Sequence, residues 1–150
     1  MGKLAMIHAN TPAIQVFDPR GLSVRGVAYH RRERASVPEP CITQQEYDGA
    51  GHAVLGRDPR LFRLQQDGQT AANQQNVFSL SGAVVLSQNS DAGWRLGLLG
   101  AHGQCVEGWD QKLSQSRVAY DPQCRPVASF ERAWQGPERC IARFTYAGID

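Results

Sequence analysis

A short residue frame recurs five times along this chain and constrains its fold more than any other feature. Each copy starts with an aromatic or apolar residue, usually followed by Asp, then by two variable residues, usually Gly, two more residues and Val. The copies span 17–24, 47–54, 78–85, 99–106 and 120–127, so their starts are 30, 31, 21 and 21 residues apart. A sixth copy begins at Tyr146. Self-similarity at periods of about 20 to 50 residues is typical of repeat architectures, so we expect one structural unit per copy.

The residue types of the frame predict that each copy is a β-hairpin. The leading aromatic suits a pleated, half-buried strand, and Asp in the first turn position can accept a hydrogen bond from the backbone two residues on. Gly three residues later supplies the positive φ that a tight turn needs. Cys124 stands in that Gly position in the fifth copy, so we expect its turn to differ or to be strained. The closing valines, which we expect on one side of a continuous sheet, are Val24, Val54, Val85, Val106 and Val127.

Between the turns, alternating and β-branched segments predict short strands, which indicates an all-β protein of consecutive antiparallel hairpins. Helix is expected only over Arg60–Gln66, after Pro59, because no other segment keeps the helical period. Gln65–Gln75 is expected to be a surface loop. The expected strands are Leu4–Ile7, Ala13–Phe17, Val24–Arg31, Cys41–Tyr47, Ala53–Asp58, Asn76–Leu80, Ala83–Gln88, Gly93–Leu99, Cys105–Asp110, Ser116–Tyr120, Val127–Glu131 and Cys140–Tyr146.

This pattern predicts three parts of the chain: a lead-in over residues 1–12, a repeat strip over 13–146, and the truncated start of a further repeat over 147–150. Composition excludes several other classes of protein. The chain has 41% apolar and 20% charged residues, which is typical of a folded globular protein. The net charge is only +2, so there is no electrostatic case for nucleic acid or an anionic membrane as a partner.

Targeting signals are also missing from the sequence. No segment has the roughly 18 consecutive apolar residues that a membrane helix needs. Residues 1–10 lack the apolar core and the small-residue cleavage site of a secretory signal. We therefore expect synthesis in the cytoplasm, with any release by another route.

Several segments of the chain resemble one known family. The Tyr-Asp frame with spacings of 21 residues is the signature of rearrangement-hot-spot (RHS) or YD repeats. From about residue 8 to residue 146, the chain resembles the N-terminal region of the C component of insecticidal Tc toxin complexes. The segments that carry this resemblance are Thr11-Pro12, Phe17-Asp18-Pro19-Arg20-Gly21-Leu22, Asp58-Pro59-Arg60-Leu61, Phe78-Ser79-Leu80-Ser81-Gly82, Asp91-Ala92-Gly93-Trp94-Arg95 and Leu98-Leu99-Gly100.

This resemblance implies a structural role in toxin delivery and bacterial virulence. In that family, RHS repeats form a long β-sheet strip that spirals with the B component into a closed hollow shell. The shell encloses a cytotoxic C-terminal segment, which is kept unfolded until it passes into the target cell. The self-cleaving protease and the toxin of the family follow several hundred residues further on, so we expect neither here. The implied partners are further RHS repeats and a B-type component, with release as part of a toxin complex and no membrane insertion.

The residues themselves give no case for an enzyme, and we expect no catalytic, cofactor-binding or metal-binding residues. Asp18, Asp48 and Asp121 recur at equivalent turn positions, so one structural role explains them better than a glycosidase-type carboxylate pair. The motifs of serine hydrolases, P-loop proteins, dinucleotide-binding proteins and zinc proteases do not occur in the sequence. His52 and His102 fall at variable turn positions, so we expect them to be exposed turn residues and not metal ligands.

The cysteines are too few and too widely spaced for a disulfide-stapled domain, and we expect free, partly buried thiols. His102 and Cys105 have the spacing of half a zinc site, but no second compact pair accompanies them. The four cysteines are Cys41, Cys105, Cys124 and Cys140.

Two classes of function stay open at this point. The first is a structural segment of a toxin-delivery shell. The second is an independent β-rich binding module, for example for carbohydrate, in which exposed aromatic side chains contact the ligand. We expect Trp94, Trp109 and Trp134 to pack on a sheet face, which favours the first class. Further YD repeats downstream would support the shell, and glycan binding by the chain alone would support the module.

Overall fold

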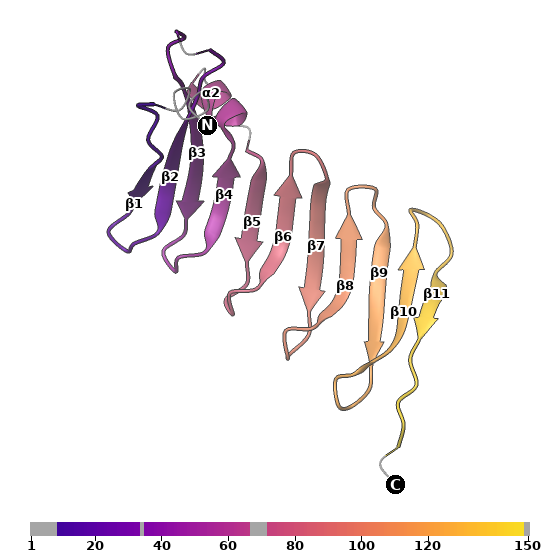
Figure 1. The fold of residues 1–150 in the computed structure, drawn as a ribbon. Helices are drawn as coiled ribbons and strands as arrows, with labels where there is room; N and C mark the ends of the chain where they lie inside the picture. The colour runs from indigo at the N-terminus through magenta and orange to yellow at the C-terminus, as the bar shows by residue number, and fades with distance from the viewer. Residues whose placement is uncertain (1–8, 34, 67–71, 149–150) are drawn as a thin grey trace. The chain divides into compact units, whose positions relative to one another are not determined.

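A computed structural model describes residues 9–33, 35–66 and 72–148 of the chain, and it is all-β with little helix (Figure 1). The described residues form eleven strands and one helix, α2. Every strand pairing that is resolved is antiparallel and joins strands that follow each other along the chain. The chain divides into two compact units, Met1–Gln75 and Asn76–Asp150.

The first unit is a row of hairpins with a helix on one face. Each strand is hydrogen-bonded to the strand before it in the chain. The helix follows the fourth strand. The strand after the helix then pairs with the fourth strand, with Gln75 opposite Leu55. In chain order the elements are β1 (Ile14–Phe17), β2 (Ser23–His30), β3 (Glu39–Tyr47), β4 (Ala53–Arg57), α2 (Pro59–Gln66) and β5 (Gln74–Phe78), which ends in the second unit.

The second unit continues the same pattern without a helix. Its six complete strands are joined by five antiparallel pairings, each between strands that follow one another along the chain. They are β6 (Val84–Asn89), β7 (Gly93–Leu99), β8 (Cys105–Asp110), β9 (Gln115–Tyr120), β10 (Pro126–Arg132) and β11 (Arg139–Arg143). The prediction of an all-β fold of consecutive antiparallel hairpins is therefore confirmed.

Most of the strands lie within two residues of their predicted bounds, and β7 and β8 match them fully. The last strand is shorter than predicted: β11 ends at Arg143, whereas the predicted strand ends at Tyr146. Pro126 on the neighbouring strand has no N–H to offer to the ladder, so regular pairing stops at the level of Ala128 and Arg143. The predicted strand Leu4–Ile7 and residues 67–71 of the predicted loop lie outside the described residues.

The frame valines share one face within each unit, as predicted. Side chains alternate along a strand, and directly paired residues lie on the same face. In the first unit, Val24 and Val54 therefore lie on the face that carries Gly26 and Thr43, which are paired. We call it the valine face, and in the second unit it carries Val85, Ser87, Arg95, Gly97, Val106, Gly108, Ser116, Val118 and Val127.

The opposite side, which we call the leucine face, is covered by the helix in the first unit. Asp58 caps α2 by accepting a hydrogen bond from the Leu61 N–H at 2.8 Å, and Pro59 in the first helical position has a φ suited to the helix. The helix packs on β3 and β4 and buries Leu61 and Phe62, which are 7% and 6% exposed. The Arg25 guanidinium of the leucine face lies 5.3 Å from the Phe62 ring centre.

Little apolar surface is fully buried elsewhere. Among the described residues, Leu61 and Phe62 are the only hydrophobic side chains in the buried class. The chain exposes 11066 Å² of accessible surface, whereas a compact monomer of this mass would expose about 7,500 Å². Within residues 9–33, 35–66 and 72–148, the chain therefore does not bury a core like that of an independent domain of this size.

Candidate interaction surface

The frame turns are built by one repeated set of backbone hydrogen bonds. In the turn at Asp18, the N–H of Gly21 donates to the carbonyl of Asp18 at 2.9 Å, and the N–H of Asp18 donates to the carbonyl of Leu22 at 2.9 Å. The same two bonds occur at the turns that begin with Asp48, Ser79, Gly100 and Asp121. The frame therefore corresponds to one turn geometry, in all five copies.

The frame carboxylates hold these turns, as predicted. Oδ1 of Asp121 accepts hydrogen bonds from the N–H groups of Gln123 and Arg125 at 3.0 and 2.9 Å. Asp18 and Asp48 bind the equivalent pairs of N–H groups. This structural role accounts for the recurrence of Asp at all three positions.

The second carboxylate oxygen binds a basic side chain in each turn. It accepts from Nε of Arg20 at 2.8 Å and of Arg125 at 2.7 Å. At Asp48 the partner is Nδ1 of His52 at 2.9 Å, so His52 is half-buried and not fully exposed as predicted. The pairing of His52 with Asp48 was not predicted, because the frame position of His52 carries a basic residue in only some of the copies.

These contacts keep the carboxylates ionised. Hydrogen bonding by the N–H of Leu22, and then by the Arg20 side chain, lowers the pKa of Asp18 below its ordinary value. The pKa of Asp48 is lowered most by its hydrogen bond with the His52 side chain. The pKa of Asp121 is lowered most by the hydrogen bond from the N–H of Arg125.

The turn glycines have the positive φ that the frame predicts. Gly21 and Gly51, for example, have φ values of 82° and 92°. Cys124 adopts the same turn with φ of 60°, a conformation that costs a side-chain-bearing residue about 1 to 2 kcal/mol. The fifth turn is therefore strained and does not differ in type.

Sequence reasoning missed a sixth turn of this kind, at Asp110. Its Oδ1 accepts from the N–H groups of Lys112 and Ser114 at 2.9 and 3.0 Å. Leu113 takes the glycine position with φ of 59°. Trp109-Asp110 supplies the first half of the frame, but the missing Gly and Val concealed the match.

A β-bulge follows each frame turn for which pairing is resolved. Leu99 lies opposite Cys105, and the register then shifts before Leu98 pairs with Glu107. Equivalent shifts occur at Phe17, Tyr47 and Tyr120. The frame therefore encodes a hairpin that bends at a fixed place, since a bulge increases the local twist.

The outer strands leave backbone groups available for pairing. β1 pairs with β2, and β11 with β10, and neither has a second strand partner among the described residues. Apolar side chains on these strands are exposed, with Ile14 at 43%, Phe17 at 55% and Ile141 at 56%. An unpaired apolar strand edge is a template for a further strand.

The leucine face of the second unit is open, with no helix over it in the described part of the chain. Val84, Leu96 and Leu98 are 45%, 36% and 51% exposed on this face. Arg117 and Glu138 form a two-bond ion pair there, at 3.1 and 2.9 Å. The face is therefore mixed, with apolar side chains beside paired charges.

The valine face of the second unit is hollowed where glycines replace side chains. A groove of about 550 Å³ lies over β6 to β10 and is lined by Arg95, Gly97, Gly108, Asp110 and Ser116, among others. Of the tryptophans, Trp94 and Trp109 are half-buried in the sheet and Trp134 is 60% exposed. The exposed aromatic side chains among the described residues are therefore Trp134 together with Phe17, Phe144 and Tyr146.

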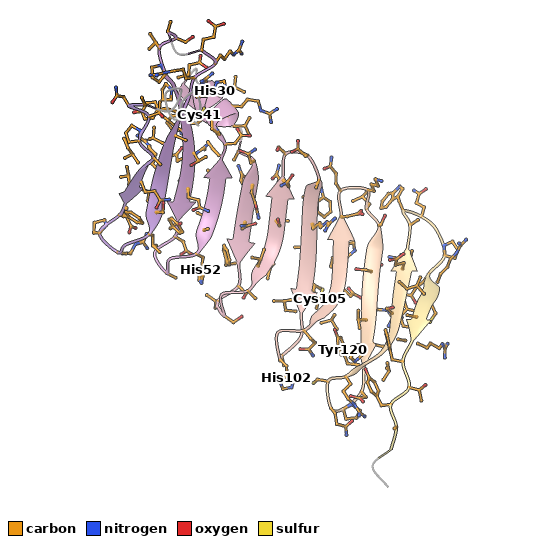
Figure 2. The ribbon with its side chains drawn as sticks, in the orientation of Figure 1. His30, Cys41, His52, His102, Cys105 and Tyr120 are labelled. Atoms are coloured by element: carbon orange, nitrogen blue, oxygen red, sulfur yellow. The ribbon has the colours of Figure 1, made fainter. Side chains whose placement is uncertain are left out.

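The histidines and cysteines that the sequence analysis weighed as metal ligands lie on different elements. Figure 2 shows His52 and His102 at different turns, and His30 and Cys41 near the opposite end of their strands. All four cysteines are free, but Cys105 and Cys140 are exposed and not partly buried as predicted. No group of three metal-binding side chains occurs within residues 9–33, 35–66 and 72–148. No helix in the same ranges is long and apolar enough to cross a membrane.

The chain is similar in sequence to curated toxin subunits. No protein-family model matches it. Toxin subunit YenC2 of Yersinia entomophaga is 36% identical over 101 residues, which cover 67% of this chain and 10% of that subunit. Toxin subunit YenC1 of the same organism is 29% identical over 151 residues, covering 96% and 15%. The chain therefore spans only a small part of the length of these relatives.

Solved structures agree with the sequence comparison. The crystal structure of TcdB2-TccC3 has a TM-score of 0.90 at 26% identity, and covers 95% of this chain and 7% of that chain. The Photorhabdus luminescens Tc holotoxin pore has a TM-score of 0.89 at 26% identity with the same coverage. By its sequence similarity to toxin subunits and by its hairpin fold, the chain is a Tc toxin C-component-like RHS protein.

Proposed function

We propose that this chain is a wall segment of an RHS-type toxin-delivery shell, without catalytic activity of its own. The observation that carries this proposal is the hairpin strip whose outer strands, β1 and β11, each pair on one side only among the described residues, and whose sheet faces are largely exposed. In a strip of repeats, each hairpin is stabilised mainly by its neighbours. Such a segment gains stability only when further strands and faces cover it.

The partners that fit these edges are β-strands of the same kind. We propose further RHS repeats beyond β11 and a B-type component as the partners, as the solved complex of TcdB2 with TccC3 suggests by its name. Main-chain pairing would supply the affinity, and apolar side chains such as Ile14 and Ile141 would set the register. The enclosed cargo would be a toxin segment, and release from the producing cell would occur as part of the complex.

A segment exchange tests this function directly. The region of YenC1 that aligns with this chain over 151 residues is replaced by the chain, and the chimera is expressed with the B-type component of that system. We expect a closed particle that protects the C-terminal segment of the chimera from added protease. A matched chimera with Arg143→Pro removes an N–H that points away from β10, because the N–H of the next residue, Phe144, donates to the Val127 carbonyl on β10. This chimera should lose the protection.

The outcome that would contradict the proposal is equally clear. A chimera that folds by circular dichroism and binds the B-type component, but leaves its C-terminal segment open to protease, would show that this chain does not serve as shell wall. Saturable glycan binding by the 150-residue chain would support the alternative of an independent binding module.

A further inference from the structure

The tyrosines of the repeat frame all make the same contact with the preceding repeat. The Tyr120 hydroxyl donates to the carbonyl of Cys105 at 2.9 Å. The Tyr47 hydroxyl lies 3.1 Å from the carbonyl of Ser23 and also 2.8 Å from Oε1 of Gln45 on its own strand. The Tyr146 hydroxyl donates to the carbonyl of Pro126 at 2.8 Å. Figure 2 shows Tyr120 and Cys105 close together on neighbouring hairpins.

The three acceptors occupy one position of the frame. Ser23, Cys105 and Pro126 each stand immediately before the closing valine of the preceding copy. The same residues lie at the β-bulge, opposite the leading residue of their own frame. A bulge leaves backbone groups outside the regular ladder, and the tyrosine of the next repeat satisfies one of them.

The fourth tyrosine provides an internal comparison. The chain has four tyrosines, and Tyr29 is the one outside the frame. It lies within β2 on the leucine face, and its hydroxyl has no hydrogen bond to any described residue. The contact therefore follows from the frame position and not from tyrosine as such.

We propose that, in the copies that begin with tyrosine, the hydroxyl of the frame tyrosine fixes the register of its hairpin against the preceding one, and thereby favours that hairpin as a neighbour. A shift by one residue would turn every side chain to the other face, and would move the bulge carbonyl away from the hydroxyl. Arg125 supports the arrangement at the last copy, where its guanidinium lies 4.4 Å from the Tyr146 ring centre. This inference concerns the strip alone and does not depend on what the strip encloses.

The fourth copy shows where the contact is missing. Its leading residue is Leu99, which has no hydroxyl, and the residue before the valine of the preceding copy is Val84. The substitution Leu99→Tyr should therefore create the contact with the Val84 carbonyl. It is a gain-of-contact counterpart to the loss variant Tyr120→Phe, which keeps the ring and removes only the hydroxyl.

Urea unfolding of the 150-residue chain and its variants tests the stabilising effect. We expect Tyr120→Phe to reduce the folding equilibrium constant about threefold to tenfold, and Leu99→Tyr to raise it about threefold, as for the net contribution of one hydrogen bond. Tyr29→Phe is the matched control and should leave it within about twofold. Equal effects of Tyr120→Phe and Tyr29→Phe would overturn the proposal.

A second measurement separates hydrogen bonding from packing and needs no variant to fold well. In the unsubstituted chain with tyrosine labelled at the ring carbon that bears the hydroxyl, NMR reports the exchange of each hydroxyl proton. We expect three slowly exchanging hydroxyls, from Tyr47, Tyr120 and Tyr146, and fast exchange at Tyr29. Fast exchange of all four hydroxyls would refute the contact.

Discussion

Removing the Phe62 side chain should unfold the first unit in preference to the second. Phe62 is 6% exposed and is one of two hydrophobic side chains in the buried class among the described residues. Truncation of a buried Phe to Ala costs about 3 to 5 kcal/mol. We expect about 3 kcal/mol for Phe62→Ala, because a two-residue cluster can collapse more easily than a deep core.

The contact with Arg25 adds a small electrostatic part to this cost. The guanidinium lies 5.3 Å from the ring centre, and a cation–π contact at a partly exposed site contributes about 0.5 kcal/mol. Phe144→Ala is the matched control, since Phe144 is 46% exposed and should cost about 1 kcal/mol or less. Both variants remove the same atoms, so the difference between them measures burial.

Amide hydrogen exchange with urea unfolding is the appropriate assay, because it resolves the two units. Phe62→Ala should raise exchange in β2 to β4 and leave β8 to β10 close to the unsubstituted chain. If Phe62→Ala is no more destabilising than Phe144→Ala, or if both units lose protection equally, then α2 does not stabilise the first unit by burying Phe62.

Three further predictions concern the turns. Asp121→Asn should change stability slightly and Asp121→Ala more, because Asn still accepts the backbone N–H bonds; thermal melts that rank the two in the opposite order would contradict the turn role. Cys124→Gly should stabilise the chain by about 0.5 to 1 kcal/mol, because glycine adopts a positive φ without strain. Gly103→Ala, at φ of 79°, should destabilise it. If chemical denaturation shows that both substitutions change the free energy of unfolding in the same direction, the strain at Cys124 is refuted. The folded-state pKa values of Asp18, Asp48 and Asp121 lie below the ordinary 3.8. Their contribution to the stability of the fold is therefore present above about pH 4 and is lost as the pH falls below it. An acid titration in which the free energy of unfolding does not fall below about pH 4 would argue against the hydrogen bonds of these carboxylates.

Much of the fold follows directly from the sequence, because the frame combines several signals that agree. Asp, Gly and Val at fixed offsets predict the turn, its φ and the face of the next strand, and the structure has all three. The helix is found where Pro59 predicts it, and the structure adds Asp58 as its cap.

The parts that could not be predicted depend on contacts whose partners leave no residue signature. The frame tyrosines donate to backbone carbonyls, so the acceptor residues Ser23, Cys105 and Pro126 share no side-chain chemistry. The turn at Asp110 was not predicted, because Leu113 stands where the frame has Gly. Arg57 is 8% exposed and forms an ion pair with Glu46, and no local pattern indicates this burial or this pairing.

Sedimentation velocity and thermal melting of the 150-residue chain alone test most directly whether it is a wall segment. Its outer strands lack partners among the described residues, and few apolar side chains are buried. We therefore predict a marginally stable chain that self-associates, and that becomes monodisperse when co-expressed with a B-type component or with following repeats. A monodisperse monomer with a cooperative, high-temperature transition would show that these residues close their own core, and would contradict the account.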